Sequence, residues 1–476
     1  MSNIPTSSAG RRIAALLDDN SFVEIGAAVT ARATDFNLNA QDTPSDGVIT
    51  GYGLIGGEPV YVYSQDASVL GGSIGEMHAK KITNLYNLAI KVGAPVIGLI
   101  DSTGIRLQEA TDALMSLGSI YKKMSLASGV IPQIVGIFGS CGGGLATCAA
   151  LADFVFIEET KGKLFVNSPN AIKGNTEEKN DTSCAAFAAN QSGNADFVGD
   201  EATVIAQIRA LSAILPASNR VINDADGTDD LNRLIPDLKG NIDDAAIALS
   251  QIADAGTYLE LKKDWAQDMV TAFIKLDGIT VGAVANRTVV YDENGKAAEF
   301  DGSLSVRGAR KAAAFVRFCD AFDIPVLTLT NVSGYEASVC AERHLAQASA
   351  ELAYAFAEST VPRVNVITRK AFGSAFVAMN SKSLGADVTF AWKDAKIGTM
   401  DSNLAAKIMF EGQGSETISE KAAEYEKLQG SAESAARRGY VDTVIDPSET
   451  RKYVIGAFEM LYTKTEEHYD KKHGAL

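Results

Sequence analysis

Pro95-Val-Ile-Gly-Leu-Ile-Asp-Ser-Thr-Gly104 is the stretch that decides the fold, because it returns 230 residues later as Pro325-Val-Leu-Thr-Leu-Thr-Asn-Val-Ser-Gly334. In each copy a proline opens an apolar run, and a glycine follows nine positions after that proline. A short apolar run bounded by proline and glycine is typical of a buried strand that ends in a turn. Buried strands are therefore expected at Val96 to Ile100 and at Val326 to Thr330, and the chain is expected to contain two copies of one fold.

A second pair of apolar runs keeps the same offset. Pro132 opens a run 37 positions after Pro95, and Gly143 ends that run. Pro362 and Gly373 bound the corresponding run in the second copy. Chance does not readily place four such punctuating residues in one register across 49 residues. Each copy is therefore predicted to hold two strands that end in glycines.

The flanking pattern predicts an α/β fold. Helices with one apolar face are expected at His78 to Lys91 and Ala309 to Phe322, and Lys81 and Lys311 repeat at the same offset. Earlier strands are expected at Gly47 to Tyr52, Val60 to Ser64, Val270 to Lys275 and Thr280 to Asn286. Alternating helices and nearly continuous apolar strands predict stacked, mainly parallel β-sheets with helices outside. The boundary between the copies is expected near Gly240, and residues 166–230 resemble a surface insertion.

The composition is that of a globular protein with room for two cores. The chain has 476 residues, 46% of them hydrophobic and 21% charged, and a net charge of −16. That charge argues against nonspecific binding of nucleic acid or of an anionic membrane surface. The first residues contain no apolar signal-peptide core, and the five cysteines form no C-x-x-C pair. A cytoplasmic protein without a metal site is expected.

The glycine turns suggest a chemical role. The first loop reads Asp101-Ser-Thr-Gly-Ile-Arg-Leu-Gln-Glu109, and the second reads Gly139-Ser-Cys-Gly-Gly-Gly144. A glycine-rich turn between a strand and a helix can surround an anion or a polarised carbonyl oxygen with backbone N–H groups. A tight turn alone would explain any one of these glycines. Two loops repeated in both copies favour a pair of oxyanion-binding sites.

Longer motifs resemble the carboxyltransferase subunits of biotin-dependent acyl-CoA carboxylases and decarboxylases. The resemblance runs from about residue 10 to residue 455. It is carried by Tyr63-Ser-Gln-Asp66, Gly71-Gly72, His78-Ala-Lys-Lys-Ile82, Asp101-Ser-Thr-Gly-Ile-Arg106, Val316-Arg-Phe-Cys-Asp320, Thr368-Arg-Lys-Ala-Phe-Gly373 and Gly439-Tyr-Val-Asp-Thr-Val-Ile-Asp-Pro447.

The resemblance implies two crotonase-like domains in tandem. Residues 1–240 would form the acyl-CoA side, and residues 241–476 the carboxybiotin side. The active site would lie between the N-domain of one subunit and the C-domain of another, in a homo-oligomer that is a dimer or a dimer of trimers. CO2 would move between carboxybiotin and the α-carbon, or a vinylogous carbon, of an acyl-CoA. Two oxyanions would need stabilising, one in each domain, and each N–H donor would contribute about 3–4 kcal/mol.

Family donors map onto residues of both copies. In the first copy they are Gly143 and Gly144, faced by Gly104 and Ile105; in the second they are Ser374 and Ala375 after Gly373, faced by Gly334 and Tyr335. The resemblance and the charge pattern also suggest four substrate-binding residues, namely Lys80 and Lys81 for CoA phosphates, Arg106 beside the first loop, and Val377 in the acyl pocket.

The chain departs from the family pattern in four places. Thr103 and Ser374 each replace a glycine, Ser333 stands where proline is common, and Met400-Asp-Ser-Asn403 replaces Met-Gly-Ala/Pro-Glu. A backbone N–H survives each glycine replacement. These departures leave the identity of the acyl group open.

Biotin is expected to arrive on another protein. The sequence contains no Met-Lys pair, and hence no Met-Lys-Met biotinylation motif, and it contains no Walker A pattern. The expected partners are a biotin carboxyl carrier protein and either a biotin carboxylase or a membrane-embedded decarboxylase subunit. Membrane association would then come only through such a partner. The direction of the reaction stays open.

Three other functions compete with this interpretation. An enoyl-CoA hydratase or isomerase would need glutamates over the acyl carbons. The glycine turns themselves contain none, and Glu109, at the end of the first loop, is most simply a solvated loop or helix-start residue. A ClpP-like serine peptidase would use Ser140 or Ser374 with His78 or His344, but the chain has no G-x-S-x-G elbow. A non-catalytic scaffold would be favoured only if Thr103 and Ser374 closed the two sites.

Overall fold

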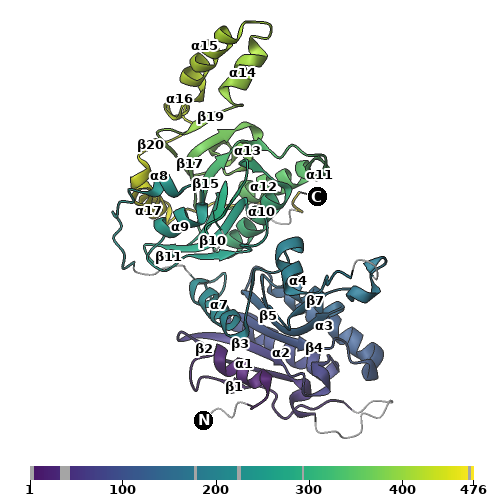
Figure 1. Ribbon diagram of the computed structural model, residues 1–476. Coiled ribbons are helices and arrows are strands. Elements are labelled where there is room, and N and C mark those ends of the chain that lie inside the picture. The colour runs from purple at the N-terminus through teal and green to yellow at the C-terminus, as the bar shows by residue number, and fades with distance from the viewer. Residues whose placement is uncertain are drawn as a thin grey trace. The chain divides into compact units, whose positions relative to one another are not determined.

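The computed structural model describes residues 5–32, 43–175, 179–221, 227–291, 294–469 and 473–475. The chain forms two compact units, Met1–Ile222 and Asn223–Leu476 (Figure 1). The division lies upstream of Gly240, the boundary expected from the sequence. Gly240 itself belongs to a short helix, α8 (Leu238–Asn241), in the second unit.

The first unit is built on an eight-stranded sheet in the order β1-β2-β3-β4-β5-β6-β8, with β7 paired to β5. Its strands are β1 (Val23–Glu24), β2 (Val48–Ile55), β3 (Glu58–Gln65), β4 (Val96–Ser102), β5 (Gln133–Gly142), β6 (Phe154–Glu158), β7 (Lys163–Phe165) and β8 (Phe197–Gly199). Its main helices are α1 (Ser8–Leu16), α2 (Glu76–Val92), α3 (Ala110–Ala127), α4 (Gly144–Leu151), the short α6 (Ala185–Phe187) and α7 (Glu201–Ile214).

The second unit repeats this sheet, in the order β20-β18-β17-β15-β11-β10-β9 with β19 paired to β17. Its strands are β9 (Leu259–Leu261), β10 (Met269–Leu276), β11 (Ile279–Asn286), β15 (Val326–Val332), β17 (Arg363–Phe372), β18 (Val388–Trp392), β19 (Lys396–Gly398) and β20 (Thr443–Ile445), with the small pairs β12 (Val289–Tyr291)–β13 (Ala297–Glu299) and β14 (Ser303–Leu304)–β16 (Gly334–Tyr335). Besides α8, its helices are α9 (Ala245–Ile252), α10 (Val306–Ala321), α11 (Val339–Glu342), α12 (Leu345–Glu358), α13 (Gly373–Ala378), α14 (Ser402–Met409), α15 (Ser415–Tyr425), α16 (Ala432–Arg437) and α17 (Thr450–Leu461).

The duplication extends to the irregularities of the sheets. In the first unit the pairing of β4 with β5 shifts register between Ile100 and Ser102. In the second unit the pairing of β15 with β17 shifts between Thr330 and Val332, again 230 residues later. Such bulges redirect a strand where it leaves the ladder. Both glycine loops therefore leave their sheets at equivalent places, and the expected α/β fold with duplicated sheets is confirmed.

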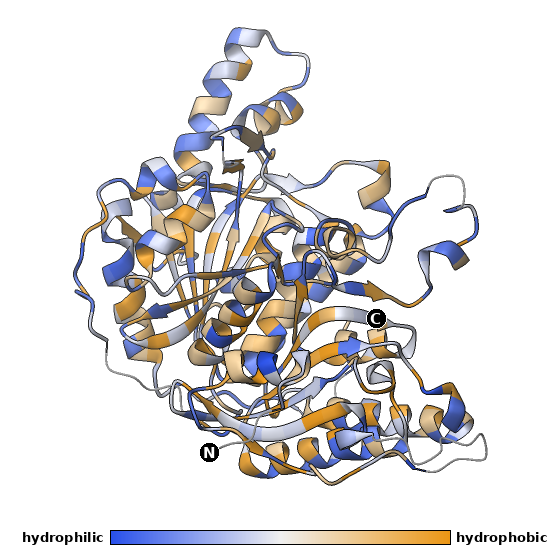
Figure 2. Ribbon diagram, turned by 60° about the horizontal axis from the view of Figure 1, so that its bottom comes forward, coloured by the Kyte–Doolittle hydropathy of each residue, from blue (hydrophilic) through white to orange (hydrophobic). Residues whose placement is uncertain are grey.

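Local sequence explains why the repeated helices form and where they end. In α2 the residues at helical spacing, including Ile82, Leu85 and Ala89, are buried against the sheet. Gly93 ends the helix in the left-handed conformation with φ of 76°, which glycine adopts without steric cost. Figure 2 shows that apolar and polar residues alternate along the helices that cover the sheets.

One segment expected at the surface is partly internal. Within residues 166–230, α7 buries Val204, Ile208 and Leu211 completely, and the Asp200 side chain caps its N-terminus through the N–H of Thr203. The segment around this helix is rich in Asn, Asp and Ser, so its composition does not indicate a buried helix. The interpretation of the whole segment as a surface insertion was therefore wrong.

Helices α14 and α15 pack against each other and project from the body of the second unit, at the top of Figure 1. They are followed by a π-helical turn and by α16, which returns the chain to the body of the unit. Among the described residues, no helix has the length and apolar character needed to cross a membrane.

A buried carboxyl group in the first unit makes stability sensitive to pH. Asp153 accepts a hydrogen bond from the Gln133 N–H at 2.7 Å, but it forms no ion pair with any described residue. Burial raises the pKa of Asp153 to about 7. Its counterpart in the second unit, Asp387, accepts from the Arg363 N–H and is paired with Lys464 at 2.9 Å.

We expect the wild-type protein to lose stability relative to an Asp153→Asn variant as pH rises from about 4 to about 7. The folded protein favours the protonated carboxyl, so this contribution is present below the unfolded pKa and is lost as pH rises through the folded pKa. The difference amounts to at most about 4 kcal/mol. Thermal unfolding of both proteins between pH 4 and pH 8 measures it, and parallel midpoints across that range would contradict the assignment.

Candidate active site

The two glycine loops of the first unit meet at the ends of β4 and β5. Ser102 pairs with Cys141 directly after the register shift. A Cβ placed on Gly104 would lie 3.9 Å from the Gly142 carbonyl oxygen, so these loops face each other. Gly142, Gly143 and Gly144 are half-buried, which leaves them accessible to a ligand.

Gly143 shapes the second loop rather than donating to a ligand. Its φ of 61° and ψ of −130° belong to a region that is open almost only to glycine. Its N–H donates to the Phe165 carbonyl at 2.9 Å, so the expected role of Gly143 as a donor is wrong. Gly144 and Leu145 begin helix α4, and their N–H groups have no acceptor among the described residues.

The first loop shows a similar division of roles. The Gly104 N–H donates to Ser102 Oγ at 3.1 Å, so Gly104 is not a free donor either. Ile74 N–H donates to Gly104 O, and Arg106 N–H donates to Ile74 O. The Ile105 N–H between these two bonds has no acceptor among the described residues. The first unit therefore offers the N–H groups of Ile105, Gly144 and Leu145.

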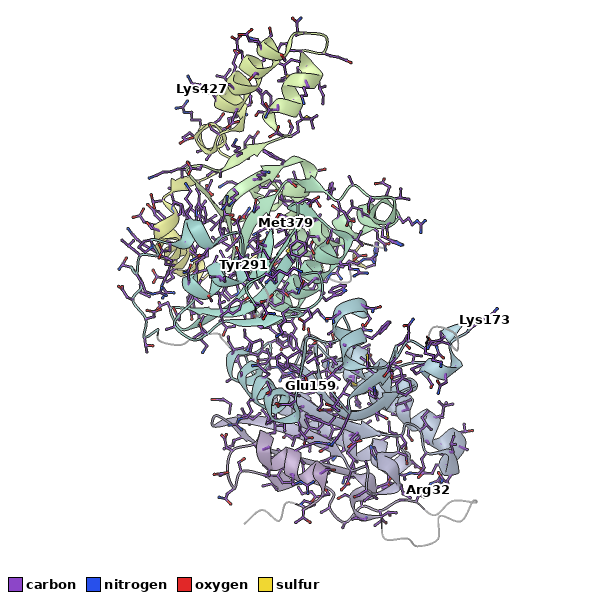
Figure 3. All side chains as sticks on the ribbon, in the orientation of Figure 1. Arg32, Glu159, Lys173, Tyr291, Met379 and Lys427 are labelled. Carbon is purple, nitrogen blue, oxygen red and sulfur yellow. The ribbon has the colours of Figure 1, made fainter. Side chains whose placement is uncertain are left out.

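The second unit places its glycine loop beside a cavity of about 510 Å³. Gly373 has φ of 65°, Ser374 is exposed, and Ala375 is 0% exposed in the first turn of α13. Met379, labelled in Figure 3, follows this helix and is fully buried. The cavity is lined by Gly373, Ser374, Phe376, Val377, Ile397, Gly398, Thr399, Tyr425, Gln429, Ala435, Arg438 and Tyr440.

The facing loop of the second unit is held differently. Gly334 has φ of 143°, and a Cβ there would meet no atom within 4 Å. Gly334 and Tyr335 form strand β16, which pairs in parallel with Ser303 and Leu304. The Tyr335 hydroxyl also hydrogen-bonds Ser349 Oγ at 2.6 Å. Tyr335 thus takes the place that Ile105 has in the first unit.

Arg106 is not placed to bind substrate. Its side chain is 1% exposed. Nη1 donates to Asp46 at 2.6 Å and to Glu109 at 2.8 Å, while Nη2 and Nε donate to Ser73. All three nitrogens of its guanidinium group therefore donate inside the first unit, and the expectation of a substrate-binding role is corrected.

The two candidate CoA-binding lysines lie in different environments. Lys81 is buried, and its Nζ donates to the carbonyls of Ser45 at 3.1 Å and Val48 at 2.5 Å, so it is not available to a phosphate. Burial lowers the pKa of Lys81 to about 8. Its counterpart Lys311 donates in the same way to the carbonyls of Lys262 and Trp265. Lys80 is exposed and lines a separate cavity of about 370 Å³.

The departures from the family pattern leave both sites open. Thr103 is exposed, and its side chain lies against Gly71 rather than over the Gly104 loop. Ser374 is exposed at the mouth of the second cavity. Val377 is 42% exposed and lines that cavity, as its expected position in a pocket requires. Thr103 and Ser374 therefore do not close the two sites, which was the condition for favouring a non-catalytic scaffold.

The geometry also bears on the other enzymes considered. His78 is completely buried; its Nδ1–H donates to Asp46 O, and its Nε2 accepts from Gln65. Burial, together with the nearby Arg106 charge, lowers the pKa of His78 to about 3. It cannot serve as the base of a peptidase. Glu109 is buried and paired with Arg106, so it cannot lie over an acyl chain as a hydratase glutamate would.

Several residues of these sites were missed in the sequence. Leu145 follows the two expected glycines, and the strand-to-helix pattern could have indicated its N–H. Tyr425 and Arg438 come from α15 and the end of α16, far along the chain from Gly373. The only sequence signal near Tyr425 and Arg438 was the motif that begins at Gly439. Among the described residues, no cluster of three His, Cys, Asp or Glu side chains could hold a metal ion.

Comparisons with known proteins agree with this geometry. The carboxyl transferase domain family matches residues 7–476. The chain is 40% identical to the methylmalonyl-CoA decarboxylase subunit alpha of Propionigenium modestum and 40% identical to the propionyl-CoA carboxylase beta chain of Roseobacter denitrificans. Each alignment covers 98% of this chain and 92% of the relative.

A solved structure is similar over the same length. The transcarboxylase 12S structure with hydrolysed methylmalonyl-coenzyme A superposes with a TM-score of 0.91 and 35% identity, covering 98% of this chain and 92% of that one. These matches confirm the expected class, a carboxyltransferase component of a biotin-dependent acyl-CoA carboxylase or decarboxylase, over the alternatives. This chain, with a duplicated sheet and one N–H site in each unit, belongs to the carboxyl transferase family.

Proposed function

We propose that the chain moves CO2 between a biotin group carried by another protein and the propionyl-CoA/methylmalonyl-CoA pair. The proposal is carried by one observation: in both units, N–H groups without an acceptor among the described residues follow equivalent strand ends. Relatives named for carboxylation of propionyl-CoA and for decarboxylation of methylmalonyl-CoA support the choice of acyl group. Both reactions interconvert the same pair of thioesters.

The first unit is assigned the acyl-CoA side. The N–H groups of Ile105, Gly144 and Leu145 would converge on the thioester oxygen, which gains negative charge when the α-carbon loses its proton or its carboxyl group. Preorganised donors stabilise that charge more strongly than they stabilise the neutral thioester. Gly143 contributes by holding the peptide that carries the Gly144 N–H, since its own N–H is fixed to Phe165.

The second unit is assigned the biotin side. The cavity of about 510 Å³ is large enough for a bicyclic ring, and the exposed residue Ser374 lines it. Phe376, Tyr425 and Tyr440 provide aromatic walls. Biotin, when delivered, supplies the carboxyl group and the nitrogen that exchanges a proton with the α-carbon. The N–H groups of Ser374, Ala375 and Tyr335 would then hold the ureido oxygen.

Two further contacts are proposed for the substrate. Val377 presents an uncharged side chain to the cavity assigned to biotin, where it would face a small apolar acyl substituent at the point at which carboxybiotin and the thioester meet. Lys80 lines the cavity of about 370 Å³ with Asn84 and Asn87, and these groups would hydrogen-bond a CoA phosphate. Lys81 supports the floor of that cavity through its bonds to Ser45 and Val48.

The proposal includes partners and location. A biotin carboxyl carrier protein would deliver the biotin, and a biotin carboxylase or a membrane decarboxylase subunit would set the direction of the reaction. The relatives named above are subunits of larger enzymes, and transcarboxylase 12S assembles as a hexamer. We accordingly propose a cytoplasmic homo-oligomer that reaches a membrane only through a partner.

Carboxyl transfer by the purified chain should depend completely on added biotin. The sequence contains no biotinylation motif, so avidin reagents should not label the protein. With methylmalonyl-CoA and either free biotin or a biotinylated carrier, propionyl-CoA should form at a measurable rate. Turnover without biotin would reject the proposal, and a preference for malonyl-CoA would reject only the acyl assignment.

A further inference from the structure

We propose that Arg106, Asp46 and Glu109, here called the Arg106 cluster, act as positioning residues for the Ile105 N–H. The cluster fastens the loop that carries Ile105 to the start of helix α2. The proposal rests on the proposed function, because it assigns the reason for which that loop must be fixed. It makes Arg106 important for turnover although Arg106 touches no substrate.

Each carboxylate of the cluster accepts one hydrogen bond from Arg106 and one from a backbone N–H of α2. Asp46 accepts from Arg106 Nη1 through Oδ1 and from the His78 N–H through Oδ2, at 2.6 and 2.8 Å. Glu109 accepts from Arg106 Nη1 through Oε1 and from the Glu76 N–H through Oε2, at 2.8 and 2.6 Å. Both N–H groups belong to the first turn of α2. The start of α2, the two carboxylates and Arg106 therefore form one buried unit.

The backbone connects this unit directly to Ile105. The Arg106 N–H donates to Ile74 O at 2.9 Å, and the Ile74 N–H donates to Gly104 O at 2.8 Å. Nη2 of Arg106 also donates to Ser73 O at 2.8 Å. The peptide between Gly104 and Arg106 is thus held on both sides. Its remaining N–H, that of Ile105, points away from Ile74 and has no acceptor among the described residues.

Packing around the cluster leaves no room for adjustment. The side chains of Asp46 and Glu109 are completely buried, and that of Arg106 nearly so. Gly75 lies so close that an added Cβ would collide with Glu109 Oε1 and Arg106 Nη1. A buried guanidinium in such a planar arrangement cannot be replaced by an ammonium, which lacks the fork of donors.

The second unit lacks this device. Glu336 stands at the position of Arg106, and Gly308 at the position of His78. The corresponding carboxylate, Asp268, accepts from Ser305 Oγ at 2.7 Å instead of from an arginine. The loop of Tyr335 is held by strand pairing and by Ser349. The cluster is therefore particular to the unit assigned to acyl-CoA.

An Arg106→Lys variant should lower kcat by about 100-fold, the size of effect expected from misplacing a reacting group by about 1 Å. The acyl-CoA dissociation constant should stay within a few-fold of the wild type. Arg451→Lys is the matched control, because Arg451 is also fully buried and paired, with Asp254 at 2.6 Å. That variant should lose thermal stability without losing kcat per folded subunit. Equal kcat in both variants would overturn the proposal.

Gly75→Ala keeps every charge and displaces the cluster, so it serves if Arg106→Lys does not fold. Hydrogen exchange measured by mass spectrometry should rise in peptides covering residues 100–110 of this variant and not in Arg451→Lys. This measurement needs no carboxyl transfer. If the wild type transfers no carboxyl group, the proposed function fails while the exchange result still decides whether the cluster holds the loop. Unchanged exchange in Gly75→Ala would overturn the proposal.

Discussion

A Gly143→Val variant should fold and assemble as the wild type does while losing at least 100-fold in carboxyl transfer, the cost of displacing one oxyanion donor. Space is not the cause, since a Cβ on Gly143 would meet no atom within 4 Å. The cause is the backbone, because φ of 61° with ψ of −130° is nearly closed to a β-branched residue. Relief of that strain would turn the following peptide and with it the Gly144 N–H.

Gly57→Val is the matched control for this prediction. Gly57 has φ of 87°, and a Cβ there also meets no atom within 4 Å, but it lies in the turn between β2 and β3. Both variants place a β-branched residue at a positive φ, which costs about 1–3 kcal/mol. Steady-state rates with biotin and methylmalonyl-CoA, accompanied by circular dichroism, separate strain from donor placement. Near-wild-type turnover in Gly143→Val would move the acyl-CoA site elsewhere.

The spacing of prolines and glycines could predict most of the fold because it records strand ends. The chain turns where a strand ends, and the prolines and glycines that mark these ends stand at the same positions in both copies. The first glycine-tipped strand was expected at Val96 to Ile100 and is found at Val96–Ser102. The counterpart strand, expected at Val326 to Thr330, is found at Val326–Val332. Each strand continues past its bulge, which apolar patterning does not mark.

The availability of individual N–H groups could not be predicted in the same way. The Gly143 N–H donates to the carbonyl of Phe165 and is therefore not free. Phe165 belongs to β7, and the sequence does not show that β7 pairs with β5. Gly104 loses its donor to the side chain of a serine two residues earlier. Glycine spacing identifies where a turn is, and long-range pairing decides which of its N–H groups remain free.

The charged residues were misjudged for a related reason. Lys81 and Arg106 look accessible in the sequence, since lysine and arginine are rarely buried without partners. Their partners, Val48 and Asp46, lie 33 and 60 residues earlier in the chain. Asp46 belongs to the segment Pro44–Gly47, in which Ser45 and Asp46 both have positive φ. That unusual turn presents carbonyl and carboxylate oxygens to the two buried cations.

Ser374→Pro should reduce carboxyl transfer at least 100-fold and leave acyl-CoA affinity unchanged, if the second unit serves biotin. Proline removes the N–H of Ser374, and the first turn of a helix tolerates proline because its N–H groups have no intrahelical acceptor. Ser374 is exposed, whereas Ala375 is 0% exposed, so proline at Ser374 perturbs the core less than proline at Ala375. Ser374→Ala keeps the N–H and should retain wild-type turnover.

Calorimetric titration with propionyl-CoA then tests the division of roles between the units. Gly143→Val displaces a donor of the first unit, so it should weaken acyl-CoA binding by a few-fold, as Arg106→Lys should, while Ser374→Pro should bind as tightly as Ser374→Ala. Tyr335 and the other residues that line the cavity are unchanged in all three variants, and Ser374→Ala controls for loss of the serine side chain, so a difference reports the N–H groups themselves. If Ser374→Pro loses acyl-CoA binding and Gly143→Val retains it, the two sides are reversed, and the second unit holds the thioester.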